Sequence, residues 1–307
     1  MKNCRFLIAA ALTLFAAGCN KPDPATPDPG TDKPDQETPV SPSEMTVTLQ
    51  QFTGNGGAEC TFGPEWAEDD AVLVYSDANK SGVRYVVKSI KNKNVAVVKP
   101  ESGSSEALGS GPYYVAWPAS AKLVYSSSKI TFTTASVQQG KDGKPARSSL
   151  FAAGYSSTTD VVLYPLCSVV NISLYGKETV SSIALSSDAA GVSGKIEAGF
   201  DGNGKLTVNN ILTKSSSVVL NVGETALGEN PANFAIVVPS ADYSAGLEFM
   251  IGTTGEYKLP VKMDALDAKC GVSYMAGQFE VTAEEPAPDP ADEKGNEGYG
   301  HHTGEWK

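Results

Sequence analysis

Ser168-Val-Val-Asn-Ile-Ser-Leu174 places apolar side chains at Val170, Ile172 and Leu174, with a polar side chain between each pair. A period of two is typical of a β-strand that has one face in a hydrophobic core. No window of the chain keeps a helical repeat for three turns, so the sequence predicts an all-β fold. Comparable short runs of β-branched or aromatic residues, separated by Gly, Ser, Asn and Pro, lie at 45–49, 71–75, 83–87, 94–98, 113–117, 129–133, 160–164, 182–185, 205–208, 217–220, 234–238, 246–251, 257–261 and 278–281.

The length of the chain bears on the number of domains. It has 307 residues, and a single hydrophobic core usually stops growing at about 250 to 300 residues. Many short strands with turn signals between them indicate β-sandwiches or barrels. We therefore expect two tandem β-sandwich domains, at residues 46–159 and 160–281, and an acidic disordered tail at residues 282–307.

The N-terminus has the pattern of a secretory signal peptide. Lys2 and Arg5 precede an apolar run that is too short to cross a bilayer core of about 30 Å. Small residues then lead to Cys19 in a pattern that resembles a bacterial lipobox, with Ala16 where Leu is usual. We expect residues 1–18 to be removed as a lipoprotein signal peptide and Cys19 to be lipidated. A plain signal peptide, cleaved nearby without lipidation, is the alternative.

Residues 19–45 are predicted to be a disordered tether. Prolines recur in this segment among Asp, Thr and Ser, and no aliphatic cluster is present, so the segment cannot bury enough apolar surface to fold. Proline-rich chain extends by about 3.1 Å per residue, which would hold a folded body several nanometres from a membrane. Lys21 and Asp23 partly match the surface-export signals of some Gram-negative lipoproteins. The predicted location is the outer membrane, anchored in its lipid through Cys19 and facing the cell exterior.

The charge of the chain excludes one class of partner. It carries 24 Lys plus Arg against 35 Asp plus Glu, a net charge of −11 at pH 7. Nucleic-acid-binding domains present basic patches or stripes. We therefore expect no nucleic-acid partner.

Histidine, the usual proton-transfer residue near neutral pH, is almost absent. His301 and His302 are the only two, and both lie in the predicted tail. The acidic cluster Glu68-Asp69-Asp70 has no second acid placed opposite it, as a glycosidase would need. The segment Asp201-Gly-Asn-Gly204 lacks the bidentate Glu of a calcium loop and fits a hairpin turn. We predict a protein that is not an enzyme and holds no cofactor or metal.

Three cysteines remain in the predicted body: Cys60, Cys167 and Cys270. An oxidising compartment allows at most one disulfide among them. We expect three buried free thiols, and a bond between Cys60 and Cys270 stays open as the alternative.

Five aromatic residues are candidates for an exposed sugar-binding platform. Alternation along a strand sends neighbouring side chains to opposite faces, so at least half of the five belong to a core. We prefer an aromatic core to a platform. The residues are Tyr113, Tyr114, Trp117, Tyr125 and Tyr155.

Several unusual segments follow one another along the body: Trp66-Ala-Glu-Asp-Asp-Ala-Val-Leu-Val-Tyr75, Tyr113-Tyr-Val-Ala-Trp-Pro-Ala-Ser120, Ser149-Leu-Phe-Ala-Ala153, Leu163-Tyr-Pro-Leu-Cys-Ser-Val-Val-Asn-Ile-Ser-Leu174, Val180-Ser-Ser-Ile-Ala-Leu185, Phe234-Ala-Ile-Val-Val-Pro239 and Ala276-Gly-Gln-Phe-Glu-Val281. In this order they resemble fimbrillin-family (Mfa-like) surface lipoproteins. The resemblance implies two transthyretin-like β-sandwich domains and a role as a fimbrial subunit or related adhesive surface protein. It also implies a maturation in which an arginine-specific protease removes the first strand of shaft subunits and a neighbour's strand fills the groove.

The sequence departs from that maturation. After Arg5 the only arginines are Arg84 and Arg147, so none lies between Cys19 and Thr61, where the cut would fall. This departure and the acidic tail favour a permanently anchored member of the family. A partner's strand would then pair in a groove at the first strand of the body, formed by Thr46, Val47, Thr48 and Leu49.

Three functions compete at this point. The first is a non-catalytic lipid-anchored surface protein, a fimbrial anchor, accessory subunit or adhesin that pairs strand edges with fimbrillin-like subunits or binds host or bacterial surface ligands. The second is a surface glycan-binding lipoprotein of a polysaccharide-uptake system, which a concave strip of exposed aromatic residues with Asn and Asp would support. The third is an enzyme, which needs two carboxylates that face each other across a cleft.

Overall fold

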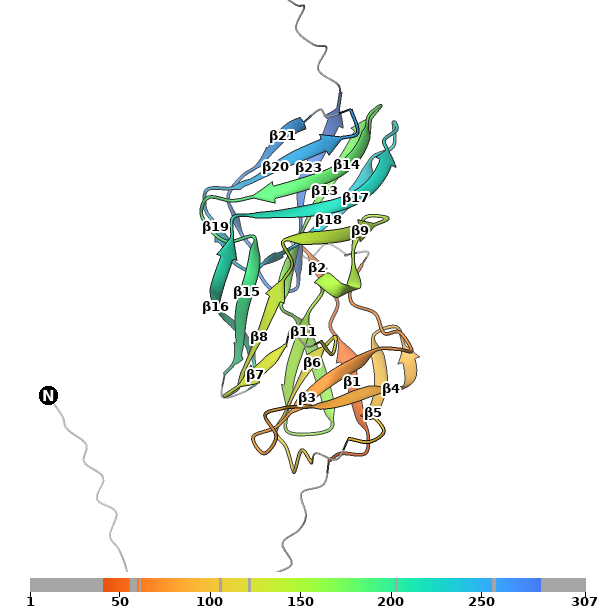
Figure 1. Ribbon diagram of the computed structural model, residues 1–307, viewed down its shortest axis with the longest axis vertical. Coiled ribbons are helices and arrows are strands. Elements are labelled where there is room, and N and C mark those ends of the chain that lie inside the picture. The colour runs from red at the N-terminus through yellow and green to blue at the C-terminus, as the bar shows by residue number, and fades with distance from the viewer. Residues whose placement is uncertain are drawn as a thin grey trace, which may run out of the picture. The chain divides into compact units, whose positions relative to one another are not determined.

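The computed structural model of the protein describes residues 41–55, 60, 62–104, 107–120, 123–201, 204–255 and 258–282. β-Strands make up most of this part of the chain (Figure 1), which also contains the short 3-10 helix η2 (Arg147–Ser149) and no α-helix. The predicted all-β sandwich fold is confirmed. Within the described residues, no helix has the length and apolar character needed to span a bilayer.

Seven strands close into a barrel, so each of them is hydrogen-bonded on both sides. Closure of this kind leaves no free strand edge. Alternate residues of each strand point inward, as in the first strand, where Met45, Val47 and Leu49 are buried. Around the barrel the strands are β1 (Met45–Leu49), β12 (Asp160–Pro165), β11 (Ala152–Ser156), β6 (Tyr113–Trp117), β3 (Ala71–Tyr75), β4 (Val83–Asn92) and β5 (Val95–Pro100).

A four-stranded sheet packs against the outer face of β6. The Tyr114 ring of β6 lies 5.7 Å from that of Phe200 and 4.9 Å from that of Tyr125. Because the barrel interior takes one face of β6 and this sheet the other, all five residues of β6 are buried. In order, the sheet contains β16 (Leu206–Ser215), β15 (Ser193–Phe200), β8 (Lys129–Thr134) and β7 (Val124–Ser126).

Two more sheets enclose a second hydrophobic cluster. The first contains β10 (Lys144–Pro145), β9 (Val137–Lys141), β17 (Ser217–Ala226), β14 (Thr179–Ser186), β20 (Leu247–Thr253) and β21 (Lys258–Met263). The second contains β18 (Ala232–Pro239), β13 (Cys167–Gly176), β23 (Val272–Val281) and β2 (Thr53–Gly54). A separate ribbon joins β19 (Asp242–Tyr243) to β22 (Leu266–Asp267).

The β13 strand serves both clusters. Val169 belongs to the barrel cluster, whereas Val170, Ile172 and Leu174 belong to the second. Since successive side chains of a strand point to opposite faces, one strand can supply two cores. For this reason β13 is buried on both faces over its first eight residues.

Strand pairing crosses the predicted domain border. The β12 strand, expected to open the C-terminal sandwich, instead pairs with β1 and β11 in the barrel, because Val161 and Leu163 fit its interior. The β8 strand pairs with β15, and β9 with β17. The division into domains at 46–159 and 160–281 stays a prediction.

The N-terminal end of the described chain is held against the barrel. The Tyr85 hydroxyl donates to the Pro42 carbonyl at 2.8 Å, and the Leu108 amide donates to Ser41 Oγ at 2.9 Å. Met45, the last residue of the predicted tether, is the first of β1 and is 1% exposed. The predicted signal peptide, most of the tether with Cys19, and the predicted tail beyond Thr282 lie outside the described residues.

Candidate functional site

The four residues predicted to form the partner-strand groove lie in β1. This strand runs parallel to β12, with Thr46 opposite Asp160, and antiparallel to β5, with Val47 opposite Ala96. Main-chain hydrogen bonds also hold the two ends of β1: the Thr46 amide donates to the Thr159 carbonyl at 2.9 Å, and the Gln50 amide donates to the Leu163 carbonyl at 2.8 Å.

The position between β5 and β12 is therefore occupied by the chain's own first strand. Val47 and Leu49 point into the barrel, while Thr46 and Thr48 lie on its outer face and are half-buried. A partner's strand would need the same alternation to take this position. Pairing with a partner at Thr46–Leu49 stays a prediction.

Two long strands with a free side carry features that oppose pairing. Among the described strands, β21 pairs only with β20, and it contains Pro260 between Lys258 and Lys262. Proline and lysine both protect sheet edges. β16 pairs only with β15 and loses register at two bulges, one of which leaves Leu212 unpaired and 43% exposed. Bulges twist an edge away from a flat partner.

The β23 edge carries less of this protection, with one bulge between Met275 and Gln278. β2 covers it only at Val272 and Ser273, and no other described strand pairs on that side. The uncovered part, from Tyr274 to Val281, contains neither lysine nor proline, and Met275 is 58% exposed. β23 is therefore one of the described strand edges suited to accept another strand.

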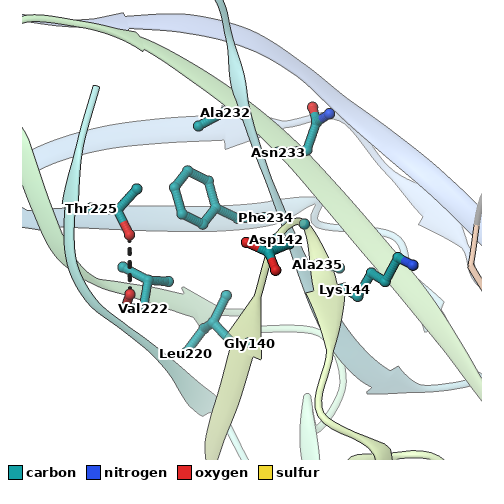
Figure 2. A pocket seen from close by; sticks show the side chains of 11 residues that line it. Gly140, Asp142, Lys144, Leu220, Val222, Thr225, Ala232, Asn233, Phe234 and Ala235 are labelled. Carbon is teal, nitrogen blue, oxygen red and sulfur yellow. Dashed lines mark hydrogen bonds between the residues drawn. The ribbon is translucent and has the colours of Figure 1, made fainter. Parts of the chain in front are cut away.

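The predicted turns lie between strands. Asp201 follows β15, where its amide donates to the Lys205 carbonyl and its Oδ1 accepts from the Lys205 amide, both at 2.9 Å. Asp142 and Gly143, with φ of 52° and 71°, link β9 to β10. A hollow of about 490 Å³ lies beside that turn. Figure 2 shows that its lining combines the apolar side chains of Leu220 and Phe234 with polar ones such as Asp142 and Asn233.

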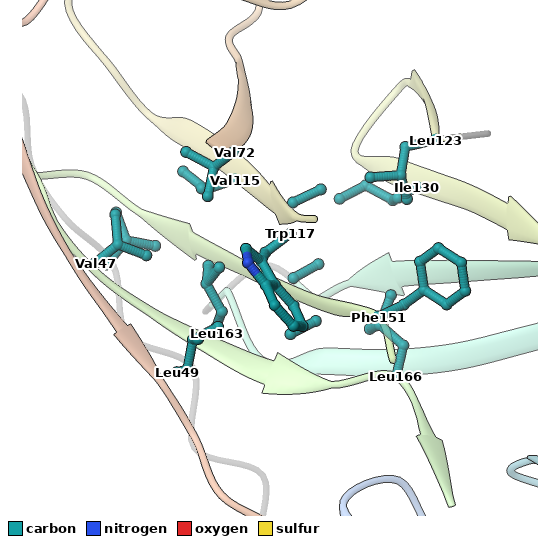
Figure 3. Packing of buried hydrophobic residues seen from close by; sticks show 14 of the residues in the cluster. Val47, Leu49, Val72, Val115, Trp117, Leu123, Ile130, Phe151, Leu163 and Leu166 are labelled. Carbon is teal, nitrogen blue, oxygen red and sulfur yellow. The ribbon is translucent and has the colours of Figure 1, made fainter. Parts of the chain in front are cut away.

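The preference for an aromatic core is confirmed for four of the five candidates. Tyr113, Tyr114, Trp117 and Tyr125 are all buried. Figure 3 shows Trp117 at the centre of the barrel cluster, surrounded by aliphatic side chains from several strands and by Phe151. Both faces of β6 are covered, so fewer of these rings reach solvent than alternation alone allowed.

The acidic cluster before β3 has a structural role. Asp70 accepts a hydrogen bond from the Ala67 amide at 2.8 Å and forms an ion pair with Arg147. Glu68 and Asp69 are exposed. Among the described residues, no group of three or more His, Cys, Asp or Glu is arranged to hold a metal ion.

The thiols of the body are free in the described structure. Cys167 is buried, and Cys60 and Cys270 are half-buried, so the expectation of three buried thiols is right only for Cys167. Burial raises the pKa of Cys167, with a smaller effect from Cys270, and burial also raises the pKa of Cys270. Because the thiolate is the reactive form, neither residue is activated as a nucleophile.

A cleft of about 830 Å³ lies over the outer face of β12. It brings together segments that are far apart in the sequence: residues 50–53, Tyr155 of β11, the outer face of β12, the start of β16 and the Cys270-Gly271 turn. Tyr155 was a predicted aromatic candidate. The other lining residues Gln50, Asp160, Val162, Tyr164 and Lys205 were not predicted from the sequence. The spacing of Asp160, Val162 and Tyr164 at every second position was the available signal.

Comparison with solved structures shows which known proteins have a similar fold. A candidate cell adhesion protein from Bacteroides ovatus matches with a TM-score of 0.51 and 14% identity, covering 79% of this chain and 92% of that one. A candidate cell adhesion protein from Bacteroides uniformis matches with a TM-score of 0.50 and 12% identity, covering 78% and 94%. The tip fimbrial protein Mfa3 from Porphyromonas gingivalis is more distant, with a TM-score of 0.32 and 12% identity over 72% and 81%.

At these identities the likeness establishes the fold. No protein-family model and no curated protein matches the sequence. The all-β sandwich class that the fimbrillin-family resemblance implied is confirmed by the strands of this structure, whereas the two transthyretin-like domains stay a prediction.

Proposed function

We propose that the protein is a non-catalytic, lipid-anchored cell-surface protein that acts as a fimbrial anchor, an accessory subunit or an adhesin. The observation that carries the proposal is the likeness of fold to two candidate cell adhesion proteins over 92% and 94% of their length. The sequence signals for lipidation of Cys19 and for a tether support an outward-facing location in the outer membrane.

The chemistry of the described residues supports a non-catalytic role. Asp70 is held in an ion pair, and burial keeps Cys167 protonated near neutral pH. Most other ion pairs of the described chain, such as Arg84 with Glu101, are exposed on both sides, and Glu197 in its pair with Lys129 is half-buried. Binding rather than bond-breaking therefore fits these residues best.

Assembly through strand edges fits two places in the fold. The uncovered side of β23 offers main-chain donors and acceptors for another strand. The position of β1, between β5 and β12, would accept a partner's strand that replaced Thr46–Leu49. Both places would join the protein to other fimbrillin-like subunits.

The test is an unboiled, non-reducing gel of outer-membrane fractions, with mass spectrometry of the N-terminus. We expect a heat-sensitive ladder or co-purifying fimbrillin-like chains, together with a lipid on Cys19. Met275→Lys, on the open edge of β23, is expected to shorten the ladder. Met250→Lys is the matched control, because β20 is paired on both sides by β14 and β21.

A single lipidated monomer without partners would contradict the fimbrial role. Co-purification with an outer-membrane transport protein would favour instead glycan capture for polysaccharide uptake. Equal loss of the ladder in Met275→Lys and Met250→Lys would show that β23 is not the pairing edge.

Replacement of β1 has a separate test. A labelled peptide with the sequence of residues 43–51 is incubated with the full-length protein and followed by fluorescence anisotropy. We expect slow binding, limited by release of the resident strand. A peptide with Asp at the positions of Val47 and Leu49 is the control, since a charge cannot enter the barrel interior. Absence of binding by the native peptide over days would exclude exchange at this position.

A further inference from the structure

The floor of the β12 cleft presents three different side chains in a row. Asp160, Val162 and Tyr164 alternate with buried residues along β12, so they share its outer face. Residues two apart on a strand are about 7 Å from each other. Val162 is 39% exposed and Tyr164 is 45% exposed, which is unusual for large apolar and aromatic side chains in the middle of a closed barrel.

Four polar side chains of the cleft are not used by the fold, whereas Gln51 and Thr53 donate to main-chain carbonyls. Among the described residues, the Gln50 amide, the Asp160 carboxylate, the Tyr164 hydroxyl and the Lys205 ammonium take part in no side-chain hydrogen bond or ion pair. The cleft therefore offers donors and acceptors of both kinds to a ligand. Asp160 and Lys205 carry opposite charges, so the net charge of the side chains that line the cleft is close to zero.

The Tyr155 ring is held in place at the side of the cleft. It packs edge-on against Tyr114, with ring centroids 5.0 Å apart, and lies 6.4 Å from Phe200. Gly204 closes over the same ring, where a side-chain Cβ would overlap Tyr155. Ala153 lies opposite Tyr164 in the β11–β12 pair, so Tyr155, two residues on, shares the face that bears Tyr164.

The ligand must be recognised through these side chains. The β12 strand is hydrogen-bonded to β1 on one side and, at Tyr164 and Pro165, to β11 on the other. The Gly154 backbone of β11 also lies close against the Val162 carbonyl, which leaves little free edge for an extended peptide. One lysine balanced by one carboxylate does not favour a phosphate or a polyanion. Aromatic faces next to unpaired amide, carboxylate and ammonium groups suit a neutral molecule that has both C–H faces and many hydroxyl groups.

We infer that this cleft binds a short neutral oligosaccharide, with sugar rings against Tyr155 and Tyr164 and hydroxyl groups bonded to Gln50, Asp160 and Lys205. A volume of about 830 Å³ falls within the range of about 300 to 1,000 Å³ that is usual for small-ligand sites. The inference rests on the surface role proposed above but does not depend on strand pairing. The protein would then bind other surfaces through this cleft as well as through its strand edges.

Titration calorimetry of the full-length protein in detergent tests the site. The probes are maltotriose, cellotriose, mannotriose, galactotriose and xylotriose at millimolar concentrations. We expect at least one to bind, and Tyr164→Ala and Asp160→Ala to weaken that binding about tenfold or more. Tyr175→Ala and Asp188→Ala, the same residue types outside the cleft, are expected to leave it unchanged. Val162→Arg, at an exposed position, fills the cleft and serves as a second blocking variant.

Absence of binding by all five sugars would overturn the inference, as would equal losses in Tyr164→Ala and Tyr175→Ala. Loss of the membrane ladder in the cleft variants, without any sugar binding, would show that the cleft holds another protein and would also overturn it. A ladder that persists while no sugar binds removes the oligosaccharide site and leaves the proposed assembly role intact.

Discussion

At the scale of single residues, Arg147 connects the loop before β3 to the barrel core. Its guanidinium donates to the Glu65 carbonyl at 2.7 Å, forms an ion pair with Asp70 and lies over the Trp117 ring at 5.6 Å from the centroid. The Asp70 side chain is only 12% exposed, so water stabilises its carboxylate less than that of an exposed acid. Asp70, which belongs to the acidic cluster Glu68-Asp69-Asp70 considered as a possible catalytic acid, is thus part of a structural contact.

Replacement of Arg147 separates this contact from ordinary surface charge. We expect Arg147→Ala to lower the free energy of unfolding by about 1 to 3 kcal/mol, because Asp70 is left without its cation in a mostly buried position. Arg84→Ala is the control: Arg84 and Glu101 are 41% and 50% exposed, and such pairs contribute about 0 to 1 kcal/mol. Urea denaturation measures both, and equal effects would contradict the prediction.

Buried tyrosines make stability depend on alkaline pH. Burial raises the pKa of Tyr75 to about 12 and, with a smaller effect from Tyr113, that of Tyr85 to about 12, whereas an unfolded tyrosine titrates near about 10. The folded state therefore holds these protons more tightly than the unfolded state. Their contribution to stability is complete below about pH 10 and is lost as pH rises toward about 12.

We expect the melting temperature to fall steeply between about pH 10 and 12. Tyr75→Phe keeps the ring beside Tyr125 but has no proton to lose, so its melting temperature should fall less steeply over the same interval. Tyr175→Phe, at a half-buried position in β13, is the comparison. The same slope in wild type and Tyr75→Phe would show that Tyr75 does not carry the effect.

At the scale of elements, β1 combines two faces with different roles. Its inward residues fill the barrel, and its outward threonines lie beside Asp160 and Val162 of the cleft floor. The strand is also the first element after the predicted tether, so any pull on the membrane anchor would load the contacts of Ser41 and Pro42 and then the hydrogen bonds of β1 to β5 and β12.

The two faces of β1 should differ in their effect on stability. Leu49→Ala removes a side chain that is 1% exposed and is expected to cost about 2 to 5 kcal/mol. Thr48→Ala, one residue away on the outer face, is expected to change stability by less than about 0.5 kcal/mol. Chemical denaturation of the two variants measures the difference. A cost for Thr48→Ala as large as that for Leu49→Ala would mean that the two faces are not distinguished in this way.

At the scale of the whole molecule, two hydrophobic clusters share strands. The β13 strand contributes to both clusters, and pairing of β8 with β15 joins the two halves of the chain. Shared strands couple the stability of the clusters, because one cannot lose its packing without exposing residues of the other.

We therefore expect a single cooperative unfolding transition in calorimetry. Trp117→Ala in the barrel cluster and Phe249→Ala in the second cluster should each lower that one transition, with a cost of about 3 to 5 kcal/mol. Two separate transitions, each sensitive to only one of these variants, would instead indicate two independently folding domains, as the sequence predicted.

The predicted anchor is tested on the intact protein in cells. Cys19→Ala is expected to move the protein from the membrane to the soluble fraction, because no other lipid attachment is predicted. Cys60→Ala, a cysteine of the body, should leave it in the membrane. Fractionation and labelled-palmitate incorporation measure the change, and retention of Cys19→Ala in the membrane would exclude this anchor.

The sequence by itself determined the all-β class and most of the aromatic core. Alternation of apolar and polar residues is a local property, and each strand must bury its apolar face whichever neighbour it receives. Runs such as Tyr113–Trp117 therefore predicted buried strands correctly. The turn between Phe200 and Leu206 followed in the same way from the conformations that glycine permits.

Only the tertiary structure decided which strands are neighbours. Pairing is a long-range property, and Asp160–Pro165 has an alternation that would suit either half of the chain; the contact with β1 and β11 places it in the barrel. That placement leaves Tyr164 exposed and brings it near Gln50, Tyr155 and Lys205. No spacing in the sequence relates these residues, because a cleft is formed by chain segments that meet only when the sheets have assembled.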